Sequence, residues 1–212
     1  MIASTAGCTE RIPFIGDEPL AFESEISTVP QSVLDETGYQ EHHIADIVIE
    51  ETVEAAGRSQ DVIVKNWQAE YDKSINFDGL DIPIDERHRA AICSVVTTPR
   101  VSVLGRSFNP ITDMSSQELA EMVQDRFDEL DTLEFIRENS VTVAGESTTA
   151  GEFETEASLV GEGVSIDLTV HITEAIKSEE DLIFAVGGYP TDLGIEERRN
   201  VFAMMEAISH PG

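Results

Sequence analysis

The sequence predicts an α+β fold in which a mainly antiparallel sheet is flanked by helices. Long stretches rich in β-branched residues recur along the chain, helical patterns are few, and the connections are short. Short connections join antiparallel neighbours, whereas a parallel pair needs a crossover of about a dozen residues or more. We expect residues 1–17 to form a leader or flexible terminus and residues 18–212 to form a single domain.

The first quarter of the domain predicts a strand, a short helix and a long hairpin. The segment Leu20–Ile26 alternates in polarity, and Pro30–Gly38 has the pattern of a short helix that ends at its glycine. Two β-branched stretches, His43–Ala55 and Asp61–Ser74, follow with a four-residue turn between them. Their period of two predicts two half-buried strands of one hairpin.

The middle of the chain predicts a buried strand and the clearest helix. The strand is Arg89–Thr98, and Val101–Leu104 adds a short extended piece. Ser115 and Glu118 have the spacing of a capping box. In this motif the serine hydroxyl and the glutamate carboxylate each accept a hydrogen bond from a free backbone amide at the start of the helix. The apolar positions from Leu119 to Leu130 that follow have helical spacing.

The last third predicts a strand meander and a final helix. Its expected strands are Ser140–Gly145, Thr148–Val160, Ser165–Ala175 and Leu182–Gly187, with turns at 161–163 and 177–181. Asp192 is placed to cap the helix Ile195–Ser209, for which Ile195, Phe202, Met205 and Ile208 are the predicted inward positions.

The charge excludes one class of protein and indicates an environment. The chain carries 42 acidic and 13 basic side chains, for a formal charge of −29 and a pI near 4.2. This field repels phosphate, so we expect no nucleic-acid partner. The acids are dispersed along the chain, and salt of molar concentration would screen their repulsion. We therefore predict an acidic surface adapted to a halophilic cell.

The N-terminus contains a possible lipidation signal. Small residues precede Cys8 in Ala6-Gly7-Cys8, as at the end of a lipoprotein signal, although Thr5 replaces the usual leucine. We expect Cys8 to carry a lipid, which would place the domain outside the cytoplasm with the anchor as its only membrane contact. A chance tripeptide and a cytoplasmic protein are the alternative. The other cysteine, Cys93, lies in an apolar run and is expected to be a buried thiol.

Four stretches carry a resemblance to a known group. They are Ala6-Gly7-Cys8, Asn66-Trp67-Gln68-Ala69-Glu70-Tyr71, Leu104-Gly105-Arg106-Ser107-Phe108-Asn109-Pro110, and the capped helix from Met114. The chain resembles uncharacterised, lipoprotein-like proteins of haloarchaea, which have no assigned activity. Its later elements also resemble the PsbP-like α/β/α sandwich, whose members are mostly binding or assembly factors. The first resemblance implies an archaeal origin, and the second implies a sandwich fold but fixes no function.

Metal and cofactor sites are not predicted. His42 and His43, followed by Asp46, could supply ligands, but adjacent residues of a regular strand point to opposite faces. Asp125, Asp128 and Asp131 would line one helix edge, which is typical of an acidic surface. No glycine-rich phosphate loop or activated serine motif is present, so we expect no cofactor and no catalytic residue.

A ligand cleft is the one binding site that the sequence suggests. Its candidate residues combine a flat aromatic surface with a scarce arginine and two amides, and are Trp67, Tyr71, Arg106, Asn109 and Asn66. Core packing of the tryptophan remains the alternative. The predicted function is a non-enzymatic, extracytoplasmic, lipid-anchored domain that binds a protein or small molecule. An enzyme whose site forms only in three dimensions, or a cytoplasmic assembly factor, are the alternatives.

Overall fold

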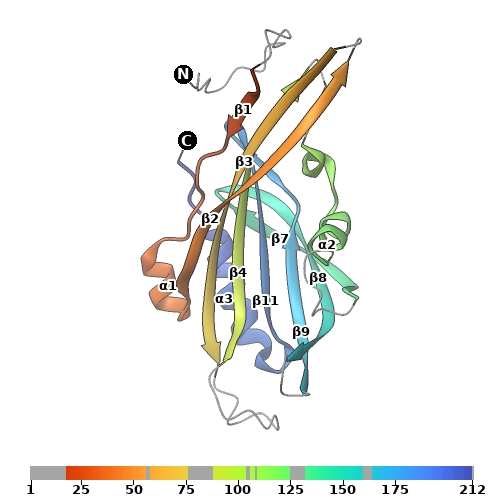
Figure 1. The fold of residues 1–212 in the computed structure, drawn as a ribbon. Coiled ribbons are helices and arrows are strands. Elements are labelled where there is room, and N and C mark those ends of the chain that lie inside the picture. Colours follow the sequence, from red (N-terminus) through yellow and green to blue (C-terminus); the bar gives the residue numbers. More distant parts are fainter. Residues whose placement is uncertain are drawn as a thin grey trace.

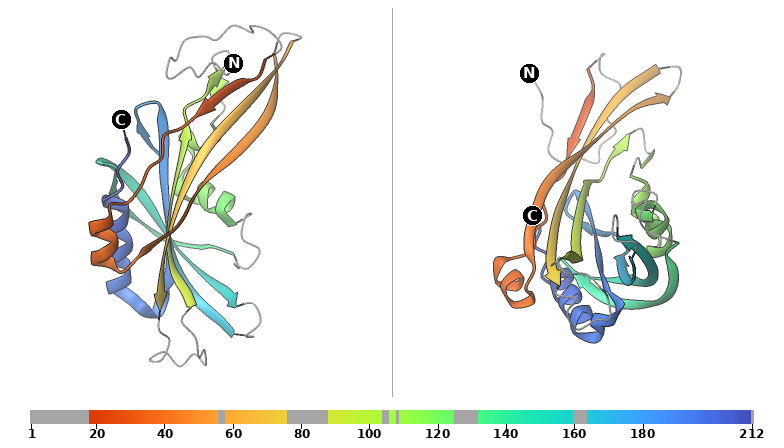
Figure 2. Two further views of the ribbon diagram at one scale, coloured as in Figure 1. Left: turned by 60° about the vertical axis from the view of Figure 1, so that its left-hand side comes forward. Right: turned by 60° about the horizontal axis from the view of Figure 1, so that its bottom comes forward.

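The protein forms one curved sheet with helices on both faces (Figure 1). The structure is a computed structural model, and it describes residues 18–55, 58–75, 88–103, 106–107, 109–124, 132–159 and 164–211. Two further views show the curvature of the sheet and the helices beside it (Figure 2). This layered arrangement of helices and sheet agrees with the predicted α+β class.

The main sheet has nine strands in the described part of the chain. Its path runs β1-β3-β4-β11-β9-β8-β7, with β2 added on β3 and β10 on β11. The strands are β1 (Leu20–Glu23), β2 (Gln40–Ala55), β3 (Arg58–Ile75), β4 (His88–Pro99), β7 (Glu134–Val143), β8 (Glu146–Leu159), β9 (Val164–Thr173), β10 (Ile176–Ser178) and β11 (Asp181–Pro190). A separate pair joins β5 (Ser102–Val103) to β6 (Arg106–Ser107).

The helices divide between the two faces of this sheet. They are α1 (Gln31–Thr37), η1 (Pro110–Asp113), α2 (Ser116–Gln124), η2 (Thr191–Leu193) and α3 (Gly194–Glu206). Alternate residues of β11 show the division, because Ile183 packs in the cluster that contains α1 and α3, whereas Leu182 packs in the cluster that contains α2. Since successive strand residues point to opposite faces, the two clusters lie on opposite sides of the sheet.

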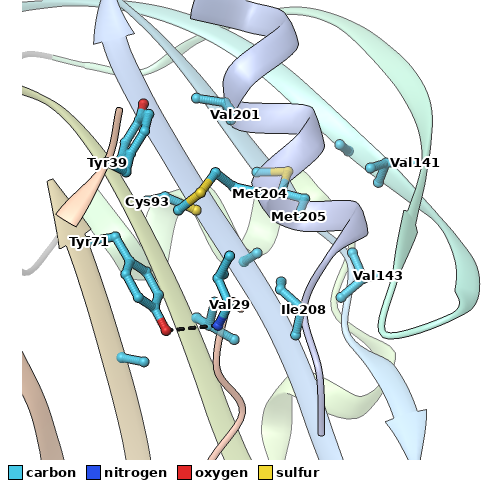
Figure 3. Close-up of a cluster of buried hydrophobic side chains, with 14 of the residues drawn as sticks. Val29, Tyr39, Tyr71, Cys93, Val141, Val143, Val201, Met204, Met205 and Ile208 are labelled. Atoms are coloured by element: carbon cyan, nitrogen blue, oxygen red, sulfur yellow. Dashed lines mark hydrogen bonds between the residues drawn. The ribbon is translucent and has the colours of Figure 1, made fainter. Parts of the chain in front are cut away.

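The larger core lies between the sheet and the α1/α3 layer (Figure 3). Val201, Met204 and Met205 of α3 are fully buried against Tyr71 and Cys93 of the sheet. Cys93 is thus the buried thiol that its apolar run predicts, and burial raises its pKa to about 12. Flexible methionines fill the irregular space between a curved sheet and a straight helix.

The second core is smaller and depends on the capped helix. Both parts of the capping box form, because Glu118 N–H donates to Ser115 Oγ at 3.3 Å and Ser115 N–H donates to the Glu118 carboxylate at 2.8 Å. Leu119 and Val123 of α2 then pack on Phe153 of β8. The expected stripe is confirmed as far as Gln124, and its later positions, Phe127 and Leu130, lie outside the described residues.

The predicted sheet needs one correction. All but one of its described strand pairs are antiparallel, but β1 runs parallel to β3, with Leu20 opposite Val62 and Glu23 opposite Lys65. The sheet is therefore mixed rather than purely antiparallel. The intervening α1 and β2 supply the connection that a parallel pair requires. The chain reverses direction between β1 and β2 and again between β2 and β3, so β3 runs in the same direction as β1.

The predicted boundaries hold for most elements, but β7 begins at Glu134 rather than Ser140, and the start of the final helix differs in its cap and its inward residues. Gly38 ends α1 in a left-handed conformation with φ +80°, as expected. Asp192 lies in η2 and forms no cap, because α3 begins at Gly194. Ile195 is 59% exposed rather than inward. It lies six residues before the buried Val201, which is about 240° around the helix.

The hairpin of β2 and β3 extends beyond the rest of the sheet (Figures 1 and 2). Its outer part is supported by β1 and by a small cluster in which Phe22 and Val64 pack on Val62 and Val101. The inner part of β3 pairs instead with β4. One strand, β3, therefore joins the extended arm to the main core, and one face of the inner part forms the surface described next.

Candidate functional site

One face of the inner hairpin carries a row of polar side chains, here called the open strip. We define it as His42 and His43 of β2 with Gln68, Glu70 and Asp72 of β3. These β3 residues alternate with Ala69 and Tyr71, which face the α1/α3 core, so the open strip lies on the opposite face. On that face α2 packs against β8 and β9, away from this hairpin.

A β-bulge brings both histidines to the open strip. The register of β2 shifts between Glu41, which pairs with Tyr71, and His43, which pairs with Glu70. His42 is the extra residue, and an extra residue breaks the alternation of side chains along a strand. The two imidazole rings consequently lie edge to face with centroids 4.9 Å apart. The expectation that adjacent histidines point to opposite faces is therefore wrong at this position.

The strip is polar throughout and partly open to solvent. His42 and His43 are exposed, whereas Gln68, Glu70 and Asp72 are half-buried. Asp72 Oδ2 lies 3.5 Å from Nδ1 of His42. Gln68 donates a hydrogen bond of 2.9 Å to the buried hydroxyl of Ser94 on β4, which fixes its amide.

Three of the predicted cleft residues lie on β3, but they do not converge. Tyr71 is buried in the core, where its oxygen accepts a hydrogen bond of 2.8 Å from Val29 N–H (Figure 3). Asn66 faces the other side of the sheet and donates to the Ile47 carbonyl at 3.0 Å. Trp67 is half-buried under the Lys65 ammonium, which lies 4.4 Å from its ring centroid. These contacts are structural.

The other two predicted cleft residues lie away from β3. Asn109 is 9% exposed and accepts a hydrogen bond from Ile111 N–H as the cap of η1. Its amide also donates to Thr98 at 2.8 Å and so ties η1 to the end of β4. Arg106 is in β6, and its side chain lies outside the described residues. The described part of the predicted cleft is therefore four residues with separate roles.

A serine, a histidine and an aspartate meet beside the C-terminus. Ser27 Oγ lies 3.0 Å from His210 Nδ1, and His210 Nε2 lies 3.4 Å from Asp181 Oδ2. A nucleophilic serine also pairs with histidine and aspartate, but it must reach a substrate. Ser27 is 1% exposed, and its oxygen accepts a hydrogen bond from Thr97 at 2.8 Å. This group fixes the C-terminal segment to the sheet.

Burial changes the pKa of two members of this group. Burial is the main cause that raises the pKa of Asp181 to about 6, against the Glu25 N–H that donates to its carboxylate at 2.8 Å. Burial also lowers the pKa of His210. Each shift favours the neutral form of its group, so burial works against a fully charged ion pair in the 3.4 Å contact between Asp181 and His210.

The α3 face contains a second buried polar group, centred on Glu152 and His171. Glu152 is 7% exposed and His171 is fully buried. Burial lowers the pKa of His171 to about 4, and its Nε2 lies 3.1 Å from the Tyr189 hydroxyl. The imidazole therefore stays neutral, and it packs edge to face on Phe202. Its contacts with Tyr189 and Phe202 are those of a packed core residue.

The described acidic residues also line one hollow, of about 470 Å³, at the far edge of the sheet. Its walls carry four carboxylates and three hydroxyls, from Thr132, Glu134, Glu154, Thr155, Glu156, Asp167 and Thr191. An acidic hollow attracts cations weakly, as does any part of a highly acidic surface. Its described lining contains no histidine, cysteine, lysine or arginine.

Comparison with known families identifies the family of this chain. A family model described as a domain of unknown function (DUF6517) matches residues 27–209. The chain belongs to the DUF6517 family. No match was found among curated proteins. The DUF6517 domain is similar to the solution structure of cyanobacterial PsbP (CyanoP) from Synechocystis sp. PCC 6803, with 15% identity and a TM-score of 0.40, over 97% of this chain and all of that one.

The family match includes the open strip and the group of Glu152 and His171, and it ends one residue before His210 of the other buried polar group. Cys8 lies before the matched segment and outside the described residues. Among the described helices, none has the length and apolar character to cross a bilayer. The description of the DUF6517 family assigns no function to this domain, and sequence reasoning missed the open strip. Only the adjacency of His42 and His43 pointed to it, since the bulge leaves no signal of its own.

Proposed function

We propose that this DUF6517 protein is a non-enzymatic binding or assembly domain, anchored outside the cytoplasm of a halophilic archaeon by a lipid on Cys8. The open strip is the observation that carries the binding role. Imidazole, amide and carboxylate side chains lie together on one sheet face, where they can offer a partner both hydrogen-bond donors and acceptors. The bound partner is a protein or a small molecule.

The described polar groups favour binding over catalysis. A catalytic group must reach its substrate, and enzymes place groups of shifted pKa in a cleft for this purpose. Here His171 is fully buried and Asp181 is 5% exposed, and the Ser27 hydroxyl beside Asp181 is enclosed. The exposed groups of the open strip are suited to hold a ligand in place.

The anchor is supported by the order Ala6-Gly7-Cys8 and is tested directly by mass spectrometry. We expect the native protein to have a lipid attached at Cys8, and the variant Cys8→Ser to move from the membrane fraction to the soluble fraction. The variant Cys93→Ala is the matched control, since it removes the buried cysteine and should leave the fraction unchanged. A native protein with unmodified Cys8 would reject the anchor and favour the cytoplasmic assembly factor.

The binding role is tested by a photoreactive amino acid placed in the open strip. We expect position 68 to give one discrete cross-linked species in the cells that produce the protein. Position 206, an exposed site at the end of α3, is the control and should give none. Equal cross-linking at both positions, or at neither, would reject the open strip as a binding surface.

A further inference from the structure

We propose that His42, His43 and Glu70 form a binding site for a zinc-class divalent ion. One ligand atom from each of these residues lies within 4.8 Å of the other two. This inference deepens the proposed binding role, because the site lies within the open strip, but it does not depend on Cys8. It reverses the expectation of no metal site, which assumed a regular strand.

The bulge creates the site. In a regular strand His42 and His43 would lie on opposite faces, and Glu70 would face only one of them. Because the bulge sets both histidines opposite Glu70, their rings meet at 4.9 Å and an interplanar angle of 84°. Two neighbouring strands therefore hold the three ligands, and the β2–β3 ladder fixes their backbone positions.

The distances suit a small tetrahedral ion. Ligand atoms about 2.1 Å from such an ion lie about 3.4 Å from one another. The three donor atoms, each within 4.8 Å of the others, need only side-chain rotations to reach that spacing. The two imidazoles are exposed, so these rotations meet little resistance and solvent can supply a further ligand.

The ligand types select the ion. Imidazole with carboxylate suits zinc, copper or nickel, whereas magnesium and calcium prefer all-oxygen sites. The carboxylates of the acidic surface attract every cation, but they offer only oxygen ligands. We therefore expect this cluster to bind a zinc-class ion selectively in the presence of K⁺ and Mg²⁺.

Asp72 acts as a positioning residue. Its Oδ2 lies 3.5 Å from Nδ1 of His42, and its side chain is 14% exposed. A carboxylate beside a metal-binding histidine orients the ring and adds negative charge to the site. We expect Asp72 to strengthen binding, since a neighbour of this kind typically changes metal affinity by about 10- to 100-fold.

The test is a Zn²⁺ titration of the full chain, read by competition with a coloured chelator at about 1 M KCl, where surface charges are screened. We expect one Zn²⁺ per chain. His43→Ala and Glu70→Gln should each weaken binding at least about tenfold, and Asp72→Asn about tenfold. Asp46→Asn is the matched control, because Asp46 is exposed on the same strand and pairs with Trp67 on the opposite face.

Two outcomes would overturn the site. One is a wild-type affinity that the His43 and Glu70 substitutions leave unchanged, and the other is an equal loss in Asp46→Asn, which would indicate diffuse binding by acids. Melting curves without metal check the fold, and His43→Gln replaces His43→Ala if the alanine variant melts early. Co²⁺ provides a second readout, since bound tetrahedral Co²⁺ absorbs visible light and this band should vanish in the His43 variant. Loss of the anchor would leave all these results unchanged.

Discussion

Arg137 and Glu152 are joined by two hydrogen bonds across the β7–β8 pair. Arg137 Nε donates to Glu152 Oε2 at 3.0 Å, and its terminal nitrogen donates to Oε1 at 2.7 Å. Asn139 donates to the same Oε2 at 3.1 Å. The Arg137 side chain is 58% exposed, whereas that of Glu152 is 9% exposed. The carboxylate therefore depends on these partners for solvation far more than the guanidinium does.

Removing the exposed partner should cost more stability than removing the buried one. We expect Arg137→Ala to lower the free energy of unfolding by about 2 kcal/mol, since it leaves the buried Glu152 carboxylate without two of its hydrogen bonds. Glu152→Ala should cost about 1 kcal/mol, because water can solvate the exposed Arg137 guanidinium that is left. Urea denaturation measures both, with Glu154→Ala, an exposed acid of the same strand, as a control within about 0.5 kcal/mol. A loss in Arg137→Ala no larger than the loss in Glu154→Ala would contradict the assignment.

The close approach of α3 to the sheet depends on the absence of a side chain at Gly187. A Cβ there would lie 2.3 Å from Cγ1 of Val201, closer than side-chain atoms approach. We expect Gly187→Ala to destabilise the protein by about 1–3 kcal/mol. Gly188→Ala is the matched control, because its Cβ would meet Ile92 at an ordinary 3.6 Å.

The same contact predicts a rescue. Adding Val201→Ala to Gly187→Ala removes the clashing methyl groups, so the double variant should lose less stability than the two single losses added together. Denaturant midpoints of the four proteins in this cycle give the coupling. Simple additivity would show that α3 moves to accommodate the alanine, and the clash would then not limit the packing.

Asp181 should make stability fall as the pH rises from about 4 to about 6. Burial raises its pKa to about 6, so the folded protein keeps a proton that the unfolded chain releases near its ordinary pKa of about 3.8. Asp181→Asn cannot ionise. We expect the free energy of unfolding of this variant, relative to that of wild type, to be about 1–2 kcal/mol higher at pH 7 than at pH 4, as measured by urea denaturation.

The matched control for this prediction is Asp192→Asn, which makes the same change at an exposed acid in η2. Its stability relative to wild type should be the same at both pH values. A difference between Asp181→Asn and wild type that does not vary with pH would mean that the carboxylate is solvated in the folded protein. Asp181 would then act only through its contacts with Glu25 N–H and His210.

Sequence patterns predicted the local elements of this fold more fully than its site. The capping box at Ser115 and the glycine that ends α1 are short-range signals, and both act as expected. The parallel β1–β3 pair depends on contacts between residues about 40 apart, for which the sequence has no local code. The bulge at His42 also depends on the pairing of β2 with β3, so the period-two pattern of the sequence could not predict it.

Four residues of the predicted ligand cleft lie apart in the structure for a related reason. Residue types suggested that Trp67 and Asn109 could meet around a ligand, but a strand period places Asn66 and Trp67 on opposite faces. Asn109 was needed to cap η1. Aromatic and amide side chains serve core packing and capping as readily as binding, and only their three-dimensional neighbours distinguish these roles.

Salt should stabilise this protein. The formal charge is −29, and the buried acids among the described residues are Glu152, Asp181 and Glu197, so repulsion acts mainly between solvated carboxylates. Raising KCl from about 0.1 M to about 1 M shortens the Debye length from about 10 Å to about 3 Å. We expect the melting temperature to rise over this range and to rise less in a variant with Glu50, Glu51 and Glu54 of β2 changed to glutamine. A constant or falling melting temperature would reject the halophilic origin, because the acid excess would then serve a purpose other than tolerance of salt.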